Sequence, residues 1–250
     1  MLKTLKLSLP LFFLIIIASG CKDSKTDAKT QNTEIVDLKE IPEVEEQPVI
    51  VKKEPTDFIP KGFVSFDTIY GDVNKDGLED CALIIKGTDK SKVITHEYRG
   101  QLDRNRRGLL VLLNTKQGYE LASKNLDCFS SENEDGGVYY APELSVEIKD
   151  QKLYISYAHG RYGYWSYTFR YQNNDFELIG YDESSNRGPI VLTETSINFL
   201  TRKKIVNQNV NENTYDDDEI FEKTESKIQR TKLMKLAEIK DFDALDLAKE

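Results

Sequence analysis

The chain has 250 residues, of which 39% are hydrophobic and 10% aromatic, so it can build a sizeable hydrophobic core. Its formal net charge of −9 at pH 7 argues against a general binder of nucleic acid or of anionic membrane. Apolar residues are concentrated between about residues 58 and 200, and the flanks on both sides are charged, so one folded domain is expected.

An export signal is predicted over residues 1–20. Lys3 and Lys6 precede an apolar run, 7–18, that ends in small residues. A membrane-spanning helix needs roughly 20 apolar residues, so this run is short for an uncleaved anchor, which is the alternative interpretation. The next residue completes the sequence ASGC, which resembles the lipobox of bacterial lipoproteins, although Ala18 replaces the usual larger aliphatic residue.

That resemblance implies that Cys21 carries acyl chains and becomes the mature N-terminus. Lys22 follows it, rather than the aspartate that retains many such proteins in the inner membrane. The resemblance therefore favours the outer membrane, on either its periplasmic or its external side. Cleavage would remove two lysines and no acidic residue, changing the net charge from −9 to −11, so attachment to the membrane would depend on the acyl chains.

Residues 21–57 are predicted to form a disordered acidic tether, because they are rich in Lys, Glu, Asp, Thr and Pro and contain no aromatic residue. Within the tether, the sequence QPVIVKKEP is a weak candidate for an edge strand, because prolines flank it. The folded domain is expected over 58–250.

Short apolar or alternating runs, separated by Gly, Asn and Asp, predict a β-rich domain. Tight turns at 114–118, 149–152 and 172–175 join successive runs, which favours antiparallel hairpins. The runs at 81–87 and 108–114 are continuously apolar, as expected of strands buried on both faces. The predicted fold is all-β, an antiparallel meander that forms a sandwich or incomplete propeller-like sheets. The candidate strands are 63–70, 81–87, 108–114, 119–124, 144–150, 152–158, 165–172, 176–182, 189–195 and 196–201.

The domain is predicted to end in a flexible acidic loop followed by a short helix. The loop is expected near 207–219, where asparagines and acidic residues predominate. Beyond the loop, apolar residues recur at spacings close to those of a helical stripe, so a short C-terminal helix packed on the sheet is expected. The stripe consists of Ile228, Leu233, Leu236 and Ile239.

A calcium site is predicted in the turn-rich sequence GDVNKDGLED, residues 71–80. With Asp72 as position one, Gly77 is sixth, where a calcium loop turns sharply. Clustered carboxylates repel one another, and a hard cation that takes six to eight oxygens would relieve the repulsion. The alternative is a metal-free loop of Asx turns. The expected ligands are the side chains of Asp72, Asn74, Asp76 and Asp80 and the carbonyl of Leu78.

This loop departs from the EF-hand, because its twelfth residue is Leu83 rather than glutamate. The pattern D-x-N-x-D-G-x-x-D leading into a strand resembles the calcium loops of FG-GAP and VCBS-type repeats, over about 63–113. The resemblance implies a calcium ion held between two strands by the four side chains named above. Only one such loop occurs in the sequence, which disfavours a closed propeller.

Two cysteines, Cys81 and Cys128, remain once Cys21 is assigned to lipid. In an exported protein such a pair often forms a disulfide. The alternative is two buried thiols that behave as small apolar side chains.

A ligand-binding face is predicted in the sequence HGRYGYWSYTFRY. It combines aromatic rings that can stack on sugars with an arginine that can bind a carboxylate. Alternate residues of a strand face opposite ways, so the competing interpretation places about half of these side chains in the core. The candidate ligand-face residues are His159, Arg161, Tyr164 and Trp165.

Two further polar tracts have competing interpretations. Glu132, Glu134 and Asp135 offer carboxylates for a second cation site or for acid–base hydrolysis of a glycan, against a simple solvated loop. The arginines of HEYRGQLDRNRRG either receive an anionic partner or pair with nearby carboxylates.

Enzymatic activity has no support from motifs, because the sequence contains no nucleophile elbow, phosphate loop, dinucleotide motif or zinc-ligand spacing. The sequence favours a lipid-anchored envelope protein with a calcium-stabilised β domain. That domain would bind a glycan or an envelope protein, or serve a structural role. The alternative is a glycan-active hydrolase.

Overall fold

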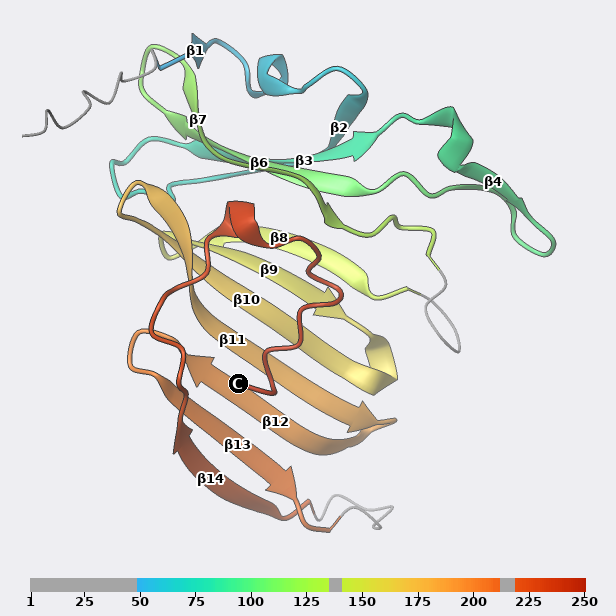
Figure 1. The fold of residues 1–250 in the computed structure, drawn as a ribbon, viewed down its shortest axis with the longest axis vertical. Coiled ribbons are helices and arrows are strands. Elements are labelled where there is room, and N and C mark those ends of the chain that lie inside the picture. The colour runs from blue at the N-terminus through green and yellow to red at the C-terminus, as the bar shows by residue number, and fades with distance from the viewer. Residues whose placement is uncertain (1–48, 135–140, 212–218) are drawn as a thin grey trace, which may run out of the picture. The chain divides into compact units, whose positions relative to one another are not determined.

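Antiparallel β-sheets build the fold: one of five strands, one of seven and one of two (Figure 1). The computed structural model describes residues 49–134, 141–211 and 219–250. Helical structure in these ranges is limited to 3-10 turns of at most four residues. The predicted all-β, antiparallel class is therefore confirmed.

Two continuously apolar strands occupy the middle of the five-stranded sheet. The first six residues of β3 and of β6 are buried, which confirms that both strands are covered on both faces. The weakly predicted edge strand also forms, as β1 at one edge of the sheet. The strand order is β1 (Val51–Lys52), β7 (Tyr119–Phe129), β6 (Arg107–Asn114), β3 (Asp80–Gly87) and β2 (Phe63–Gly71).

The seven-stranded sheet is a continuous meander that curls into a half-barrel (Figure 1). Each strand pairs antiparallel with the next along the chain, as the tight turns at 149–152 and 172–175 predict. The strands are β8 (Glu143–Lys149), β9 (Lys152–Ala158), β10 (Gly163–Gln172), β11 (Asp175–Arg187), β12 (Ile190–Asn198), β13 (Lys203–Asn209) and β14 (Phe221–Lys227).

The main hydrophobic core lies between one face of the five-stranded sheet and the inner face of the half-barrel. The sheets come into close contact where Gly71 of β2 meets β8, because a Cβ at this glycine would lie 2.7 Å from the Ile148 side chain. Large apolar side chains are excluded there for that reason. Core residues from the two sheets include Ile84, Leu109, Val111, Phe129, Leu153, Ile155, Tyr157, Tyr167 and Phe169.

A second, smaller cluster covers the other face of the five-stranded sheet. Cys81, Leu83 and Leu110 belong to it, and Phe58 packs against it from the 3-10 turn η1 (Pro55–Phe58). The predicted tether is therefore too long at its C-terminal end. Its last residues are ordered by pairing with β7 and by contact with this apolar face.

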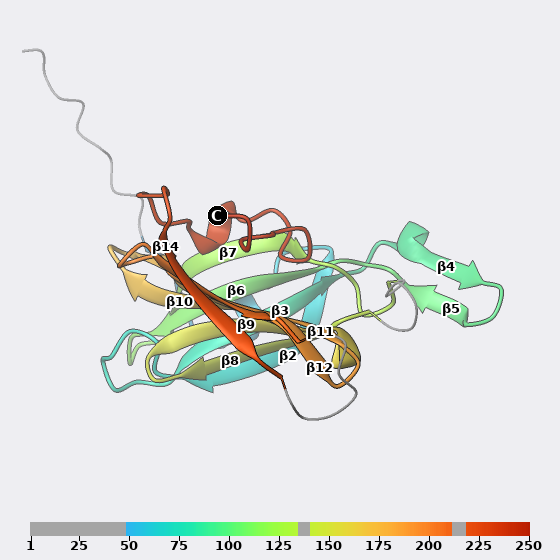
Figure 2. The same cartoon turned by 90° about the horizontal axis from the view of Figure 1, so that it is seen from below.

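A two-stranded hairpin, absent from the predicted elements, extends from the five-stranded sheet (Figure 2). It comprises β4 (Val93–His96) and β5 (Gly100–Asp103), preceded by the 3-10 turn η2 (Lys90–Lys92). Only one of the eight residues of these strands, Leu102, is buried, which explains why apolar periodicity did not indicate them.

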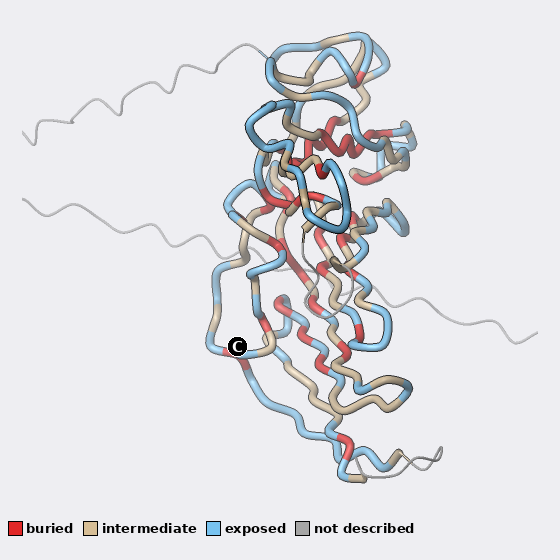
Figure 3. The backbone as a smooth tube through the Cα atoms, turned by 90° about the vertical axis from the view of Figure 1, so that its right-hand side faces the viewer, coloured by how far each residue is buried: buried red, intermediate tan, exposed pale blue. Residues whose placement is uncertain are grey.

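The predicted C-terminal helix does not form. The chain from 228 onward is irregular apart from the 3-10 turn η4 (Leu236–Glu238), and it runs across strands of the seven-stranded sheet (Figure 1). Buried, intermediate and exposed residues mix along it (Figure 3). The Tyr167 hydroxyl lies 2.9 Å from the Phe242 carbonyl oxygen and 2.8 Å from that of Leu245, so its single proton is shared between them and holds the segment in place. The segment is instead extended, and its apolar side chains are buried without forming a helix. The buried residues are Ile228, Leu236, Ile239, Phe242 and Leu247.

The region of the predicted acidic loop also needs correction. Residues 207–209 belong to β13, and β14 begins at Phe221, while 212–218 lie outside the described residues. The two candidate strands 189–195 and 196–201 are a single strand, β12. All seven residues of β14 are exposed, so backbone pairing with β13, rather than burial, maintains this strand.

Candidate functional site

A tight turn between β9 and β10 forms the first candidate site. The turn η3 (Gly160–Tyr162) is closed by the His159 N–H, which donates to the Gly163 carbonyl at 2.9 Å. Gly163 has φ of 108°, and a Cβ at this position would lie 1.8 Å from the Ser184 carbonyl oxygen. The turn therefore requires glycine at this point. It brings the rings of His159 and Tyr162 to a centroid distance of 5.2 Å.

A cavity of about 460 Å³ opens at this turn. Its walls include Glu143 and Ala141 as well as His159, Arg161 and Tyr162. The guanidinium of Arg161 makes no ion pair or side-chain hydrogen bond with any residue in the described ranges. The cavity thus combines two aromatic rings, one cation available for a ligand and one carboxylate.

The four predicted ligand-face residues separate into three places. His159 and Arg161 both line the cavity. Tyr164 does not line it, and 46% of its surface is exposed. Trp165 follows Tyr164 in β10 and faces the other way, where its ring stacks on buried Tyr157 at 5.3 Å and 14°. Trp165 lines a different hollow of about 350 Å³. Glu143 enters the cavity from β8, and no signal in the sequence links that strand to the turn.

The predicted calcium loop is held by Asx turns. Asp72 accepts the N–H groups of Lys75 at 2.7 Å and of Gly77 at 3.1 Å. Asp76 accepts the Leu78 N–H at 2.7 Å and the Asn74 side-chain amide at 3.0 Å. These hydrogen bonds orient the side-chain oxygens without a metal, as the alternative interpretation expects.

Asp80 has a different role from the other acids of the loop, because it is fully buried. Its two oxygens accept the N–H groups of Val73 and Asn114, at 2.8 and 2.9 Å, and so tie the loop to the end of β6. Burial raises the pKa of Asp80, the two backbone hydrogen bonds oppose that rise, and the charges of Asp76 and Asp72 add to it.

Only some of the predicted calcium ligands in this loop have oxygens available for an ion. Asp72, Asn74 and Asp76 lie at the accessible end, and each accepting oxygen retains a lone pair. Asp80 uses both oxygens on buried amides. In the described ranges, no group of three or more His, Cys, Asp or Glu side chains is placed to hold a metal ion. Calcium binding here would therefore draw on the Asn74 amide and the Leu78 carbonyl as well as on the carboxylates.

Both described cysteines are free thiols, so the predicted disulfide does not form. Cys81 belongs to the cluster on one face of the five-stranded sheet, and Cys128 belongs to the main core on the other face. Burial raises the pKa of the Cys81 thiol to about 12 and also raises that of Cys128. The alternative, two buried thiols that act as small apolar side chains, matches the structure.

The carboxylates proposed for glycan hydrolysis are engaged elsewhere. Glu132 lies 3.2 Å from the amine of Lys86, which also pairs with Asp103 at 2.9 Å. Glu134 accepts the Ser131 hydroxyl at 2.9 Å. Asp135 lies outside the described residues. No feature of the described part of this loop favours a pair of carboxylates flanking a substrate.

The arginine-rich sequence is largely paired with carboxylates or buried. Arg106 contacts Asp127 at 2.7 Å and Asp241 at 3.2 Å. Arg107 is buried, donates to the Ser130 carbonyl at 2.9 Å, and has its pKa lowered by desolvation. Pairing with neighbours, one of the two predicted interpretations, accounts for these side chains.

No protein-family model, curated protein or solved structure matches this chain. The described ranges contain no helix with the length and hydrophobicity needed to cross a membrane. Residues 1–20 and Cys21, to which the predicted signal and lipid anchor belong, lie outside those ranges.

Proposed function

We propose that this protein is a lipid-anchored binding module of the cell envelope, and that the cavity at Arg161 takes a sugar bearing a carboxylate. The observation that carries the proposal is the guanidinium of Arg161 in a cavity walled by the rings of His159 and Tyr162. Arginine presents a planar set of donors that matches a carboxylate. Aromatic faces pack against the C–H surface of a sugar ring.

The rigidity of the turn supports a binding role. Gly163 permits close contact with β11, and the Gly188 N–H donates to the Arg161 carbonyl at 3.0 Å. The backbone that carries the guanidinium is thus held before a ligand arrives, which lowers the entropy cost of binding. Glu143 adds an acceptor for sugar hydroxyls from the facing wall.

The test uses trigalacturonate as the probe and isothermal titration calorimetry as the measurement. Arg161→Gln should weaken binding roughly 10- to 100-fold, because a hydrogen bond to a charged group contributes about 1.5–3 kcal/mol. Lys149→Gln removes one exposed positive charge at the opposite end of β8 and is the matched control. Equal affinities for both variants, or no binding by the parent protein, would refute the site.

We also propose that calcium binds at the loop of Asp72, Asn74, Asp76, Leu78 and Asp80 and stabilises the domain. Support comes from the repulsion expected of three carboxylates in one short loop. Burial is the main cause of the raised pKa of Asp80, and the charges of Asp76 and Asp72 add to it. The ion would link the loop to the ends of β2 and β3. Its role would be structural, since the loop residues do not line the cavity at Arg161.

Anchoring through acylated Cys21 is the third part of the proposal. The ASGC sequence after an apolar run supports it, and the predicted location is the outer membrane, on the periplasmic or the external side. A flexible tether between Cys21 and β1 would hold the domain away from the bilayer.

A further inference from the structure

A larger cavity, of about 720 Å³, lies between the end of the five-stranded sheet and the base of the β4–β5 hairpin. It is separate from the cavity at Arg161 and shares no lining residue with it. Its walls come from the start of β2, the end of β3, η2 and β7, and they include Phe63, Thr88, Ser91, Asn105 and Leu126.

Backbone hydrogen bonds fix the walls of this cavity. The Thr88 N–H donates to the Gly62 carbonyl at 2.9 Å, and the Gly87 N–H donates to the Arg106 carbonyl at 3.1 Å. Asn105 is 4% exposed, and its side chain donates to the Asp89 carbonyl at 3.0 Å. The hairpin base and the sheet end are therefore joined by hydrogen bonds that involve the backbone.

The acids in the lining are already engaged. Asp127 pairs with Arg106 at 2.7 Å, and Glu134 accepts the Ser131 hydroxyl at 2.9 Å. Asp89 accepts the Ser91 N–H at 2.8 Å and so caps the start of η2. Three basic and three acidic side chains line the cavity, so the lining itself is neutral.

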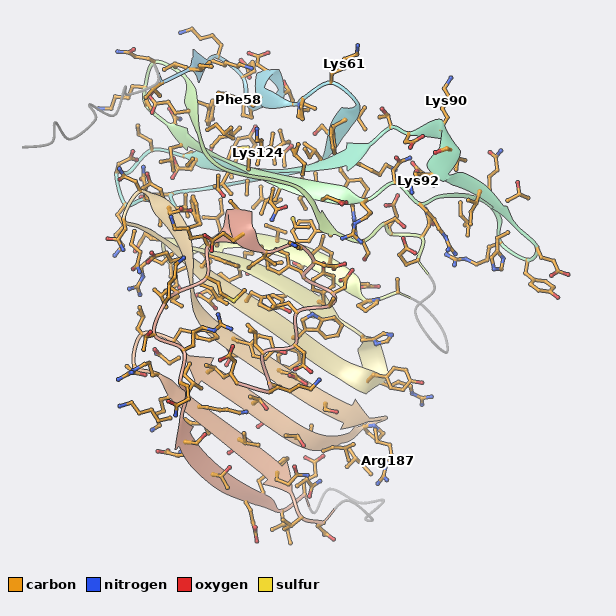
Figure 4. All side chains as sticks on the ribbon, viewed as in Figure 1. Phe58, Lys61, Lys90, Lys92, Lys124 and Arg187 are labelled. Carbon is orange, nitrogen blue, oxygen red and sulfur yellow. The ribbon has the colours of Figure 1, made fainter. Side chains whose placement is uncertain are left out.

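Exposed lysines at the rim of the cavity add positive charge to this neutral lining. Lys92 lines the cavity, Lys61 and Lys90 each adjoin a lining residue in sequence, and Lys124 precedes Leu126 by two positions on the same face of β7. Figure 4 shows all four on the part of the domain that carries the five-stranded sheet and the hairpin. All are exposed, and none forms an ion pair or side-chain hydrogen bond with any described residue.

The positive charge around this cavity affects a bound anion more than the negative net charge of the whole chain does. The rim lysines outside the lining add three positive charges to a neutral cavity, although the whole chain carries −9. Charges farther away than about 8 Å are largely screened at physiological ionic strength. For an anion at the cavity, attraction to the rim lysines would therefore exceed repulsion from acidic residues elsewhere on the chain.

From this arrangement we propose that the cavity and its lysine rim bind a linear acidic polysaccharide. Lysines spread around a concavity suit repeated anionic groups on one chain, rather than a single buried anion. Phe63, Ile94 and Leu126 supply apolar contacts for sugar rings, and Thr88 supplies a hydroxyl. A flat membrane surface would leave the concavity unfilled, and stacking platforms of several exposed aromatics, typical of single-stranded nucleic acid sites, do not occur in this lining.

The test measures binding of the full-length protein to heparin, a linear sulfated and carboxylated glycan, at several salt concentrations. The variant K61Q/K90Q/K92Q/K124Q should lose at least about tenfold in affinity and show a shallower dependence on salt. The control K116Q/K149Q/K227Q/K232Q removes the same charge from exposed lysines outside this cavity and should stay within about twofold of the parent.

Equal losses in the two variants would show that only net charge matters and would overturn the proposal, as would a parent protein that does not bind heparin. A second variant, K61Q/K124Q, leaves the hairpin unchanged and should show a partial loss, which guards against misfolding in the fourfold variant. Vesicles of anionic phospholipid serve as a further arm, and lysine-dependent binding to them without binding to heparin would overturn the choice of ligand.

Arg161→Gln separates this inference from the proposed function, because it removes a single charge from the other cavity and should lower heparin affinity much less than the fourfold lysine variant does. A loss of heparin affinity in Arg161→Gln that matches the loss in the fourfold lysine variant would move the glycan to the other cavity and overturn the assignment made here.

Discussion

Asp80 shows how one side chain changes role between the sequence and the fold. Its spacing from Asp72 suggests a metal ligand, yet its carboxylate is buried and accepts two backbone N–H groups. Burying a charged group is favourable only when hydrogen bonds compensate for lost hydration. The residue therefore contributes first to the attachment of the loop, whether or not calcium is bound.

We expect Asp80→Ala to lower the free energy of unfolding by about 3 kcal/mol, because it leaves two buried N–H groups without an acceptor. Asp76→Ala should cost less than about 1 kcal/mol under the same conditions, since that side chain is exposed. Urea denaturation in the presence of a chelator measures both changes. Similar costs for the two variants would contradict the structural role of Asp80.

The raised pKa of Asp80 also predicts the direction of a pH effect. The folded protein binds a proton here more readily than the unfolded chain, whose carboxyl titrates near 3.8. The contribution of Asp80 to stability is therefore complete below that pH and is lost as the pH rises through the folded pKa. Relative to Asp80→Asn, the parent protein should lose stability over that rise, and the opposite trend would contradict the assignment.

At the scale of elements, the β9–β10 turn depends on one glycine. Gly163→Ala places a Cβ 1.8 Å from the Ser184 carbonyl oxygen, so β10 and β11 must separate locally. We expect the free energy of unfolding to fall by several kcal/mol, roughly 3 or more, together with loss of trigalacturonate binding.

Gly188→Ala is the matched control. It has a positive φ of 65° but no atom within 4 Å of the added Cβ, so only backbone strain of about 1 kcal/mol is expected. Thermal unfolding followed by circular dichroism compares the two.

The calcium loop is tested as an element by melting temperature. With a dissociation constant of about 10⁻⁴ to 10⁻³ M, calcium at roughly 10 mM should add about 1.4–2.7 kcal/mol to the stability of the folded state. Asp76→Ala should abolish this gain. Glu147→Ala, which removes an exposed carboxylate from β8, should preserve it. If the parent protein melts at the same temperature with calcium and with chelator, the loop is an Asx-turn structure only.

Elements with clear apolar patterns were predictable, and elements stabilised by their neighbours were not. The strands β3 and β6 are apolar throughout because both of their faces are buried. The strand β14 has no apolar periodicity, and it forms because β13 offers a free edge with matching register. The spacing of Leu233, Leu236 and Ile239 resembles a helix, but contact with two sheets selects an irregular chain.

At the scale of the whole molecule, our proposal combines a lipid anchor at Cys21 with two binding cavities on the folded domain. The anchor is tested by intact mass spectrometry of the protein recovered from membranes. We expect the chain to begin at Cys21 and to carry acyl chains, and we expect Cys21→Ser to retain residues 1–20. A mature protein that begins at Met1 would exclude the lipid anchor and the envelope location that depends on it.

The candidate sites were only partly predictable, because some of them join residues that are far apart in the sequence. His159 and Arg161 are close in sequence, so their shared cavity follows from one turn. The lysine rim joins residues 61, 90, 92 and 124, which come together only when β2, η2 and β7 are assembled. The failure of the predicted Cys81–Cys128 bridge has the same origin, because the face on which each thiol lies depends on strand register.

The sequence by itself determined the β class, the central strands and the hairpin turns at 149–152 and 172–175, because these depend on local periodicity, turn-forming residues and the burial of short apolar runs. The tertiary structure alone decided the path of the C-terminal segment, the edge strands, the state of the cysteines and the larger cavity with its lysine rim. Those features depend on contacts between residues far apart in the chain, and such contacts leave no periodic signal in the sequence.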